Sequence, residues 1–384
     1  MQKKLLVFVP EFPVITETFI ARELSALVEL GQFEVQIVAM RRGTAPIPEN
    51  LKSKIYFHRV TFWDYLRGKL HSFKHPIRRF RAFKAVGFTR PFLFIKTLGY
   101  ANVFSKFQPD LIYAHFLSIP STIALGAAIL LDVPLGISGH ARDVFEYPDR
   151  VDQKIKSAKF ISICNKNAFG KLKGQNVKLI YHGINPGEIE VGAGVKRAEP
   201  PMILSIGRYV EKKGMEYLIR AAKALKDSGR EFSLVIIGGG PLEPRLKSLT
   251  ESLGLQNEVV LAGEQSFEDV RKTMHLASVY AQPSIDASGG DSDGVPNTLI
   301  EVALAGVPIV TTDAGGIRDF LSEENAILVP QKNPEKIAEG IIELLENENK
   351  AKELSANAKS RALEMFNTEK NIGELAGLIS GAMK

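Results

Sequence analysis

The sequence has little cysteine and no long apolar run. Its 384 residues include a single cysteine, Cys164, so the chain can form neither an internal disulfide framework nor a cysteine-rich zinc site. The neighbouring residues 161–163 are Ile-Ser-Ile, which favours an inert thiol in a buried strand over a nucleophile. The apolar run at 5–9 is too short for a signal peptide or a membrane span. We therefore expect a protein of a reducing compartment, the cytoplasm.

Charge is modest overall but unevenly distributed. The formal net charge is +6, yet residues 52–106 hold thirteen Lys or Arg and one acidic residue, Asp64. Aromatic residues are interleaved with these charges: Phe57, Phe62, Trp63, Tyr65, Phe73, Phe80, Phe83, Phe88, Phe92 and Phe94. Such a segment could contact an anionic membrane surface or a phosphate-bearing acceptor, which would place the protein peripherally at the inner face of the cell membrane. The alternative, a solvated helical face whose aromatics fill the core, has equal support. No nucleic-acid-binding motif accompanies the charge, so we expect no nucleic-acid partner.

Short apolar runs alternate with helical patterns along the first half of the chain, which predicts a parallel sheet. The expected strands lie at 5–9, 33–39, 110–115, 133–140, 159–164 and 177–185, and a helix is expected to begin near Thr16. Two of these strands end on histidines, His115 and His140. Open α/β sheets hold their ligands at the carboxyl ends of their strands, so both histidines are candidate site residues.

A stretch rich in proline and glycine, 186–201, predicts a linker between an N-terminal domain at 1–185 and a second domain at 202–365. In the second domain the expected strands lie near 201–208, 233–238, 259–263, 279–283, 307–311 and 326–329, with helices at 215–228 and 241–253 between them. A final helix within 366–384 is a candidate to pack back on the first domain. The predicted fold class is α/β, with two doubly wound, Rossmann-like domains that face an interdomain cleft.

The stretch from Asp286 to Glu301 predicts a glycine-rich loop that leads into a helix. Pro296 suits the first helical turn, where the N–H groups that follow Gly294 are free to hold an anion. Asp293 lies at the edge of the loop, a little over two helical turns before Glu301, so both carboxylates can face one ligand. We therefore predict a site for a negatively charged, nucleotide-linked substrate.

Two further loops follow strands of the second domain. Gly207 allows close approach of a ligand to the backbone, and Arg208 and Lys213 supply two cations that match a diphosphate. An ordinary loop with solvated cations explains that loop equally well. Gly239 and Gly240 belong to a glycine turn that lacks the dinucleotide-binding spacing, so they either line a nucleoside pocket or turn the chain.

Together these features resemble the family-4 type of retaining, GT-B-fold glycosyltransferases that use nucleotide-sugar donors. The resemblance covers the whole chain and is strongest from 202 to 347. It implies that Arg208 and Lys213 hold the donor diphosphate and that Glu301 binds the ribose hydroxyls. Asp293 stands where the family has a glutamate over the donor sugar. The other implied donor-binding residues are Gly207, Gly239, Gly240, Gly294, Val295, Pro296, Asn297 and Thr298.

The first domain carries shorter matches to the same family. The stretches 12–20 and 139–143 look like the branch that assembles bacterial exopolysaccharides and colanic-acid-type or lipopolysaccharide glycans. The resemblance implies that His140 faces the donor and hydrogen-bonds the transferred sugar or its developing charge. The candidates on the acceptor side are His115, Thr16, Glu17 and Thr18, with helix capping as an equally good role for the last three.

Asp291 and Asp293 form an Asp-x-Asp pattern, which binds a divalent metal in another glycosyltransferase fold. Since Arg208, Lys213 and a helix N-terminus already offer positive charge, we predict no metal and no cofactor beyond a UDP- or GDP-linked sugar as co-substrate. The predicted function is transfer of that sugar to a glycan or lipid-linked acceptor with retention of configuration. Two alternatives are a nucleotide-sugar-binding regulatory protein, because the first glutamate is missing, and a nucleotide-sugar epimerase of the same fold.

Overall fold

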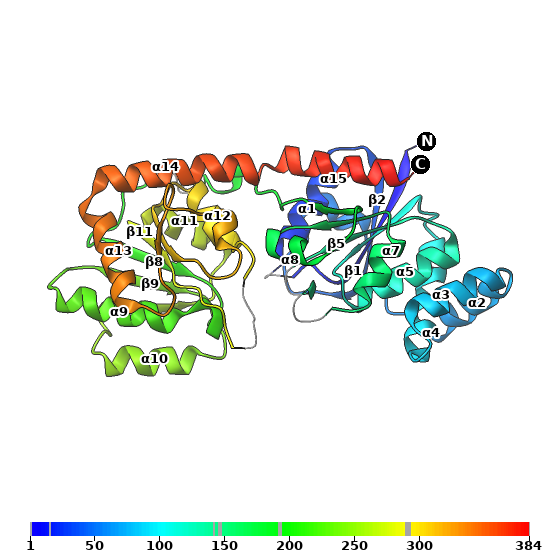
Figure 1. Cartoon of the computed structure of the whole chain (residues 1–384), viewed down its shortest axis with the longest axis horizontal. Coiled ribbons are helices and arrows are strands. Elements are labelled where there is room, and N and C mark those ends of the chain that lie inside the picture. The colour runs from blue at the N-terminus through cyan, green and yellow to red at the C-terminus, as the bar shows by residue number, and fades with distance from the viewer. Residues whose placement is uncertain are drawn as a thin grey trace. The chain divides into compact units, whose positions relative to one another are not determined.

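The chain folds into two units, each built around a parallel sheet (Figure 1). The computed structural model describes residues 2–14, 17–140, 143–144, 148–190, 194–288 and 293–383. The first unit comprises Met1–Gly183 and Thr368–Lys384, and the second comprises Ile184–Asn367. The chain thus enters the second unit before the stretch 186–201 that the sequence predicts as a linker. Described residues of that stretch contact the second unit, where Glu188 pairs with Arg271 at 2.8 Å.

The first unit holds a seven-stranded sheet of order β3-β2-β1-β4-β5-β6-β7, in which all neighbouring strands are parallel. Its strands are β1 (Lys3–Phe12), β2 (Phe33–Arg42), β3 (Ile55–Phe57), β4 (Leu111–His115), β5 (Leu135–Gly139), β6 (Phe160–Ile163) and β7 (Val177–Leu179). Its helices are α1 (Thr18–Glu29), the 3-10 turn η1 (Glu49–Lys54), α2 (Phe62–Phe73), α3 (Pro76–Val86), α4 (Pro91–Ser105), α5 (Ile119–Leu131), α7 (Val151–Ser157), α8 (Lys166–Lys171) and α15 (Thr368–Ala382).

Both faces of this sheet are covered, as the continuous apolar strands predict. Along β1, Leu6 and Phe8 point into a core shared with α3, α4 and α5. The alternate residues Leu5 and Val7 point into a second core shared with α1 and α15. The C-terminal helix therefore packs on the first unit, beside α1 (Figure 1).

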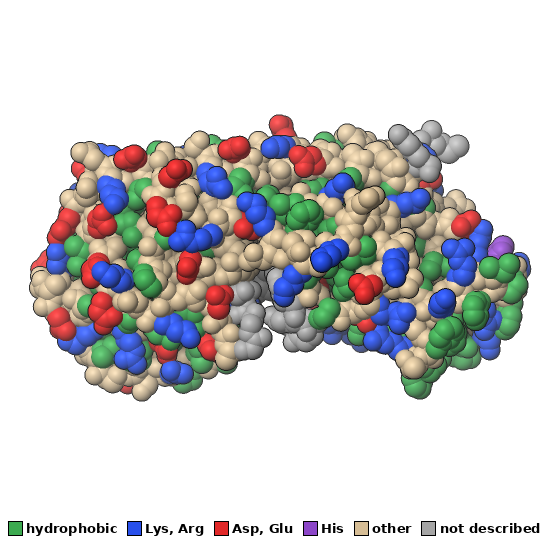
Figure 2. All heavy atoms as spheres, viewed as in Figure 1, with side chains coloured by type: hydrophobic (Ala, Val, Ile, Leu, Met, Phe, Trp, Pro, Cys, Tyr) green, Lys and Arg blue, Asp and Glu red, His purple; other side chains and the backbone are tan. Residues whose placement is uncertain are grey.

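The basic segment 52–106 contains α2, α3 and α4. Some of its aromatic side chains fill the core, since Phe94 is buried and Tyr65 and Phe83 pack against it. Many others lie on the surface: the exposed large apolar side chains here are Phe62, Trp63, Leu70, Phe73, Ile77, Phe80, Phe88, Phe92 and Ile95. Figure 2 shows apolar and basic side chains gathered over these helices, at the right-hand end of the view. We call this set of exposed residues the α2–α4 surface.

Among the helices that the structure describes, none combines the length and the apolar character needed to cross a bilayer.

The second unit holds a six-stranded parallel sheet of order β10-β9-β8-β11-β12-β13. Its strands are β8 (Met202–Ile206), β9 (Ser233–Ile237), β10 (Val259–Gly263), β11 (Val279–Gln282), β12 (Ile309–Thr312) and β13 (Ile327–Val329). Its helices are η2 (Pro186–Glu188), η3 (Glu211–Lys213), α9 (Met215–Asp227), α10 (Glu243–Ser252), α11 (Phe267–Leu276), α12 (Asn297–Leu304), η4 (Ile317–Asp319), α13 (Pro334–Glu346) and α14 (Glu348–Met365).

Strand order reverses once in each sheet, between β1 and β4 in the first unit and between β8 and β11 in the second. This confirms the predicted pair of doubly wound domains. Loops that leave neighbouring strands in opposite directions open a crevice at such a reversal, at the carboxyl ends of the strands. The residues that follow β4 and β8 are thus placed where a ligand can reach them.

Candidate active site

In the second unit, the loops after β8 and β11 bring three charged side chains together. Lys213 Nζ lies 2.6 Å from Asp293 Oδ2, and Lys212 Nζ lies 3.4 Å from Asp293 Oδ1. All three side chains are largely shielded from solvent. Burial alone would raise the pKa of the Asp293 carboxyl, but the charges of Lys213 and Lys212 hold that pKa below its ordinary value. The carboxylate is therefore ionised, and the cluster carries more positive than negative charge.

Arg208 extends the positive charge of this site. It lies two positions after the end of β8, next to Gly207, and its side chain is exposed. Of the carboxylates in the described parts of the chain, none forms an ion pair with its guanidinium, in contrast to Lys213. Arg208 is thus available to an anionic ligand, as the sequence predicts for a diphosphate-binding residue.

Glycines shape the loops around these cations. Gly240 has a φ of +150°, and a Cβ there would lie 2.8 Å from the carbonyl oxygen of Tyr209. The main chains of the two loops also bond directly, from Tyr209 N to Gly239 O at 2.8 Å. The predicted turn at Gly239 and Gly240 therefore packs against the loop that holds Gly207, Arg208 and Tyr209.

The loop from Asp293 enters α12 one residue later than predicted. Pro296 is the N-cap residue of the helix, with a φ of −61° and a ψ of 128°, and Asn297 is the first helical residue. The correction has a simple cause, since the extended ψ of Pro296 cannot belong to a helical turn. Gly294 and Val295 precede it, and Gly316 N donates to Asp293 O at 2.9 Å.

Behind this loop lies a buried polar network at the end of β11. Gln282 Oε1 accepts hydrogen bonds from Tyr280 at 2.7 Å and Thr298 at 3.4 Å, and Gln282 Nε2 donates to Ser284 at 3.0 Å. Thr298 thus joins the network that braces the loop. Glu301 is buried one turn further along α12. The sequence predicts Thr298 and Glu301 on the donor side, and the structure places both in the same short helix that follows Asp293.

In the first unit, polar side chains gather at the ends of β4, β5 and β6. Glu23 of α1 accepts a hydrogen bond from Tyr113 at 3.0 Å and lies 3.6 Å from His115 Nε2. His140 follows β5, and its ring is parallel to that of His115 with ring centroids 6.0 Å apart. The structure therefore brings the two predicted histidines together.

Burial fixes the charge of these histidines. It lowers the pKa of His115 to about 4 and holds the pKa of His140 well below its ordinary value, so both rings are neutral at physiological pH. Burial also raises the pKa of Glu23, but a hydrogen bond from His182 and the charge of that ring bring it below its ordinary value. The buried carboxylate is therefore charged.

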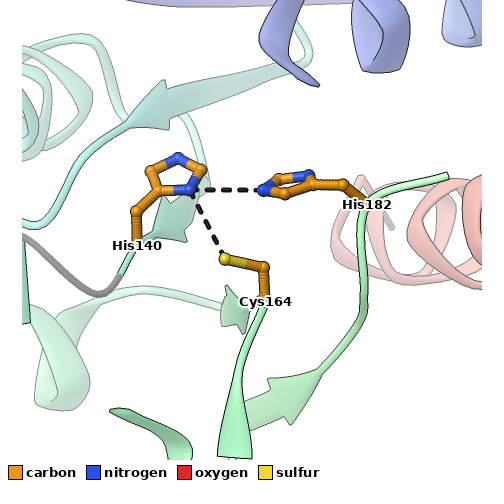
Figure 3. A group of neighbouring side chains, drawn as sticks. All are labelled: His140, Cys164 and His182. Carbon is orange, nitrogen blue, oxygen red and sulfur yellow. Dashed lines mark hydrogen bonds between the residues drawn. The ribbon is translucent and has the colours of Figure 1, made fainter. Parts of the chain in front are cut away.

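Two residues of this group, Cys164 and His182, are absent from the predicted site. Cys164 lies one position beyond β6 and is partly exposed, so its predicted place inside a buried strand is wrong. Its Sγ is 3.7 Å from His140 Nδ1, and His182 Nε2 is 3.3 Å from the same atom (Figure 3). Burial lowers the pKa of His182, but Cys164 and Glu23 raise it to about 10.

The acceptor-side candidates near the start of α1 are only partly described. Glu17 occupies the N-cap position and its side chain makes no capping hydrogen bond, while Thr18 is the first helical residue. Capping is therefore not the role of the Glu17 side chain here. Thr16, and Asp291 of the Asp-x-Asp pattern, lie outside the described residues.

Residues 188–361 match the model of a family described as glycosyl transferases group 1. The chain carries a group 1 glycosyltransferase domain. This domain occupies nearly all of the second unit and includes the Lys212–Lys213–Asp293 cluster.

This glycosyltransferase is also similar to curated relatives, one of which aligns with nearly the whole chain. It is 26% identical over 403 aligned positions to a protein of Salmonella typhimurium provisionally named colanic acid biosynthesis glycosyltransferase WcaL, with 98% of this chain and 99% of that protein covered. It is 27% identical to the amylovoran biosynthesis glycosyltransferase AmsK of Erwinia amylovora, over 53% of this chain and 51% of that protein.

A solved structure matches the fold. The crystal structure of Anabaena Alr3699/HepE in complex with UDP superposes with a TM-score of 0.74 at 17% identity, covering 98% of this chain and 100% of that one. The predicted GT-B fold is thereby confirmed.

Proposed function

We propose that this glycosyltransferase transfers a sugar from a UDP- or GDP-linked donor to a glycan or lipid-linked acceptor of a surface polysaccharide, with retention of configuration and without a metal ion. The observation that carries the proposal is the meeting of Lys212, Lys213 and Asp293 between β8 and β11. Two cations beside exposed Arg208, at the reversal of a doubly wound sheet, suit a nucleoside diphosphate. The relatives named for colanic acid and amylovoran biosynthesis support the acceptor class, and the UDP complex of HepE supports the donor class.

The chemistry follows from where charge develops. As the bond between sugar and phosphate breaks, the sugar becomes positive and the departing diphosphate becomes negative. Arg208, Lys213 and the free N–H groups at the start of α12 would stabilise that diphosphate without having to move. Glu301 would hold the ribose, and His140 the transferred sugar. The resemblance to retaining enzymes implies attack from the same face, with the leaving phosphate accepting the acceptor's proton.

A donor screen tests the activity. The full chain is incubated with UDP- and GDP-linked sugars and an extract of bacterial glycolipids, and the released nucleoside diphosphate is measured. We expect release from one donor that depends on acceptor, and a loss of about 10²–10³-fold in turnover in Lys213→Ala. Lys247→Ala, an exposed lysine of α10, is the control and should behave as the wild type. Unchanged turnover in both Arg208→Ala and Lys213→Ala would sink the phosphate assignment.

The finer points need separate measurements. Proton NMR of the newly formed glycoside should show the anomeric configuration of the donor. Turnover should persist after EDTA treatment, and abolition by EDTA with rescue by Mg²⁺ would contradict metal-independent transfer. The same assays separate the alternatives: a regulatory protein would bind the donor without turnover, and an epimerase would release an isomerised sugar without any acceptor.

We also propose that the α2–α4 surface attaches the enzyme to an anionic membrane. Phe92 and Ile77 are 81% and 75% exposed, among many basic side chains, which is the composition of an interfacial helix. Co-sedimentation with liposomes should require anionic lipid and should weaken in Ile77→Ser/Phe92→Ser. The control is Phe267→Ser, an exposed phenylalanine of α11. Equal binding to neutral and anionic liposomes would contradict the proposal.

A further inference from the structure

The side chains of His140, Cys164 and His182 converge at one point of the first unit, from the segments that follow β5, β6 and β7 (Figure 3). One potential ligand atom of each lies within 4.8 Å of the other two. Neighbouring parallel strands bring their carboxyl ends to one edge of the sheet, so residues that are distant in sequence become adjacent here.

Two short contacts meet at one nitrogen of this cluster. His140 Nδ1 lies 3.3 Å from His182 Nε2 and 3.7 Å from Cys164 Sγ. A ring nitrogen offers either one hydrogen or one lone pair, so it can satisfy only one of these partners at a time. A cation bound by all three atoms would account for both separations at once.

The separations fit a particular kind of cation. Zn–N bonds of about 2.0–2.1 Å and a Zn–S bond of about 2.3 Å put tetrahedral ligands about 3.4 Å apart for two nitrogens and about 3.6 Å apart for nitrogen and sulfur. The corresponding distances here are 3.3 Å and 3.7 Å. A thiolate and two imidazoles are also the ligands that zinc favours over Mg²⁺ or Ca²⁺.

A supporting shell surrounds the three side chains. Glu23 Oε2 lies 3.4 Å from His182 Nδ1, the ring atom that faces away from the cluster, and Tyr113 holds the same carboxylate at 3.0 Å. Metal-binding histidines are commonly oriented by such a carboxylate. Phe19 stacks on His182 with ring centroids 4.5 Å apart, and the backbone N–H of His140 donates to Asp143 at 2.8 Å.

We propose that His140, Cys164 and His182 form a binding site for a divalent transition-metal ion of the zinc type, with the fourth position open to water. The site is distinct from the diphosphate site and does not depend on the proposed sugar transfer. The metal takes Nδ1 of His140 and leaves Nε2 free to bind the sugar, so the proposed sugar transfer does not require the ion. The Cys164 thiol and Nε2 of the charged His182 ring each release a proton to solvent as the ion binds.

Because the chain has one cysteine, thiol labelling reports directly on this site. Wild-type protein, stripped of metal with EDTA, is treated with a thiol-reactive disulfide reagent with and without Zn²⁺. We expect Zn²⁺ to slow labelling at least tenfold. Labelling at the same rate in both conditions overturns the proposal. This measurement uses the unmodified protein, so it does not depend on whether a variant folds.

Cobalt supplies the spectroscopic test. Titration with Co²⁺ should produce thiolate-to-cobalt charge-transfer absorption in the near ultraviolet that saturates at one ion per chain. The band should be lost in Cys164→Ser, and affinity should fall in His182→Ala and by about 10–100-fold in Glu23→Gln. His71→Ala, an exposed histidine of α2, is the matched control and should retain the band. Absence of the band in wild-type protein, or its persistence in Cys164→Ser, overturns the proposal.

Discussion

In the proposed donor site, the carboxylate of Asp293 forms ion pairs with two lysines. The carboxylate lies 2.6 Å from Lys213 and 3.4 Å from Lys212, so it orients two cations at once. A glutamate would be one methylene longer and would reach further from the loop. If the donor binds as proposed, the aspartate would act on it through the two lysines.

A double-mutant cycle tests this coupling. Asp293→Asn and Lys213→Ala should each lower kcat/KM for the donor by about 10²–10³-fold, because each disturbs the same phosphate-binding unit. The double variant should lose little more than either single variant, since residues in contact are not additive. The exposed pair Lys223 and Asp227 of α9 serves as the control cycle and should change neither rate nor affinity. Fully additive losses at the site would mean that the two side chains act independently.

Asp64 is the buried acid at the start of α2. Burial raises its pKa, but hydrogen bonds from Thr61 and His58 lower it below the ordinary 3.8. The contacts are short, at 2.7 Å from Thr61 Oγ1 and 2.7 Å from His58 Nε2. Asp64 also forms a capping box with Thr61, in which Thr61 N donates to Asp64 Oδ2 and Asp64 N donates to Thr61 Oγ1. A carboxyl with a lowered folded pKa stabilises the protein above its ordinary pKa and loses that contribution as pH falls through the folded pKa.

Asp64→Asn should therefore destabilise the first unit by about 1–3 kcal/mol at neutral pH, since it leaves buried donors without a charged acceptor. The difference from wild type should shrink as pH falls from about 5 to about 3, because the unfolded carboxyl, with an ordinary pKa of 3.8, takes up a proton there while the folded carboxyl, whose pKa is lower, stays charged. Urea unfolding at a series of pH values measures both effects. Asp227→Asn, at an exposed position, should show neither. A difference that is constant over this range would show that charge is not the cause.

At single positions, the sequence predicts site residues at the ends of strands but not those that reach the site from other elements. His115 and His140 are found because each ends an apolar run. His182 is missed because the predicted strand runs on to 185, whereas β7 ends at Leu179. Glu23 cannot be found in this way, because an acidic residue in an amphipathic helix indicates only a polar face. Its contacts with Tyr113 and His115 are known only from the structure. The partners of Cys164 are likewise far away in sequence.

Among the elements, the loop between β8 and α9 depends on one glycine. Gly214 has a φ of +63°, and a Cβ there would lie 1.9 Å from the carbonyl oxygen of Pro283. Pro283 directly follows β11, so this contact holds the two loops of the proposed donor site together. The close approach is possible only because the residue has no side chain.

Gly214→Ala should consequently cost more than a change of backbone preference alone. Gly254 is the matched control, because it has a φ of +65° and a Cβ added there would meet no atom within 4 Å. Gly254→Ala should destabilise the second unit by about 1–2 kcal/mol. Gly214→Ala should destabilise it further and should also weaken donor binding, as measured by urea unfolding and nucleotide titration. Equal losses in the two variants would show that the Pro283 contact is not limiting.

The sequence predicts the long apolar elements correctly, but it does not predict the short or charged ones. The strands of both sheets coincide with the predicted runs, except β3, whose three residues lie in the basic segment and pair only with β2. The start of α12 shifts by one residue because proline fits both the cap and the first turn. The sequence does not show which aromatic residues of α2–α4 are exposed, because buried and exposed ones occur in the same helical pattern. Only the structure shows that Phe94 is buried and Phe92 is exposed.

For the molecule as a whole, the first unit is discontinuous in sequence, since it needs the last helix to complete its core. Ile372, Leu375 and Ile379 of α15 are buried among residues of α1 and β1, although the whole second unit, Ile184–Asn367, lies between Gly183 and this helix in the sequence. The first unit therefore cannot complete its core until the second has been synthesised. The candidate metal site lies in this unit, so its stability depends on the same helix.

Leu375→Ala should destabilise the first unit by about 2–5 kcal/mol, the usual effect of a cavity in a buried core. Because Leu375 lies outside the second unit, hydrogen exchange measured by mass spectrometry should accelerate in β1 and β4 but not in β8 or β11. Leu363→Ala, on an exposed position of α14, should change neither. Faster exchange in β8 together with β1 would contradict two separately stabilised cores. Slower exchange in β1 than in β8 of the wild type would likewise contradict a first unit that depends on a single closing helix.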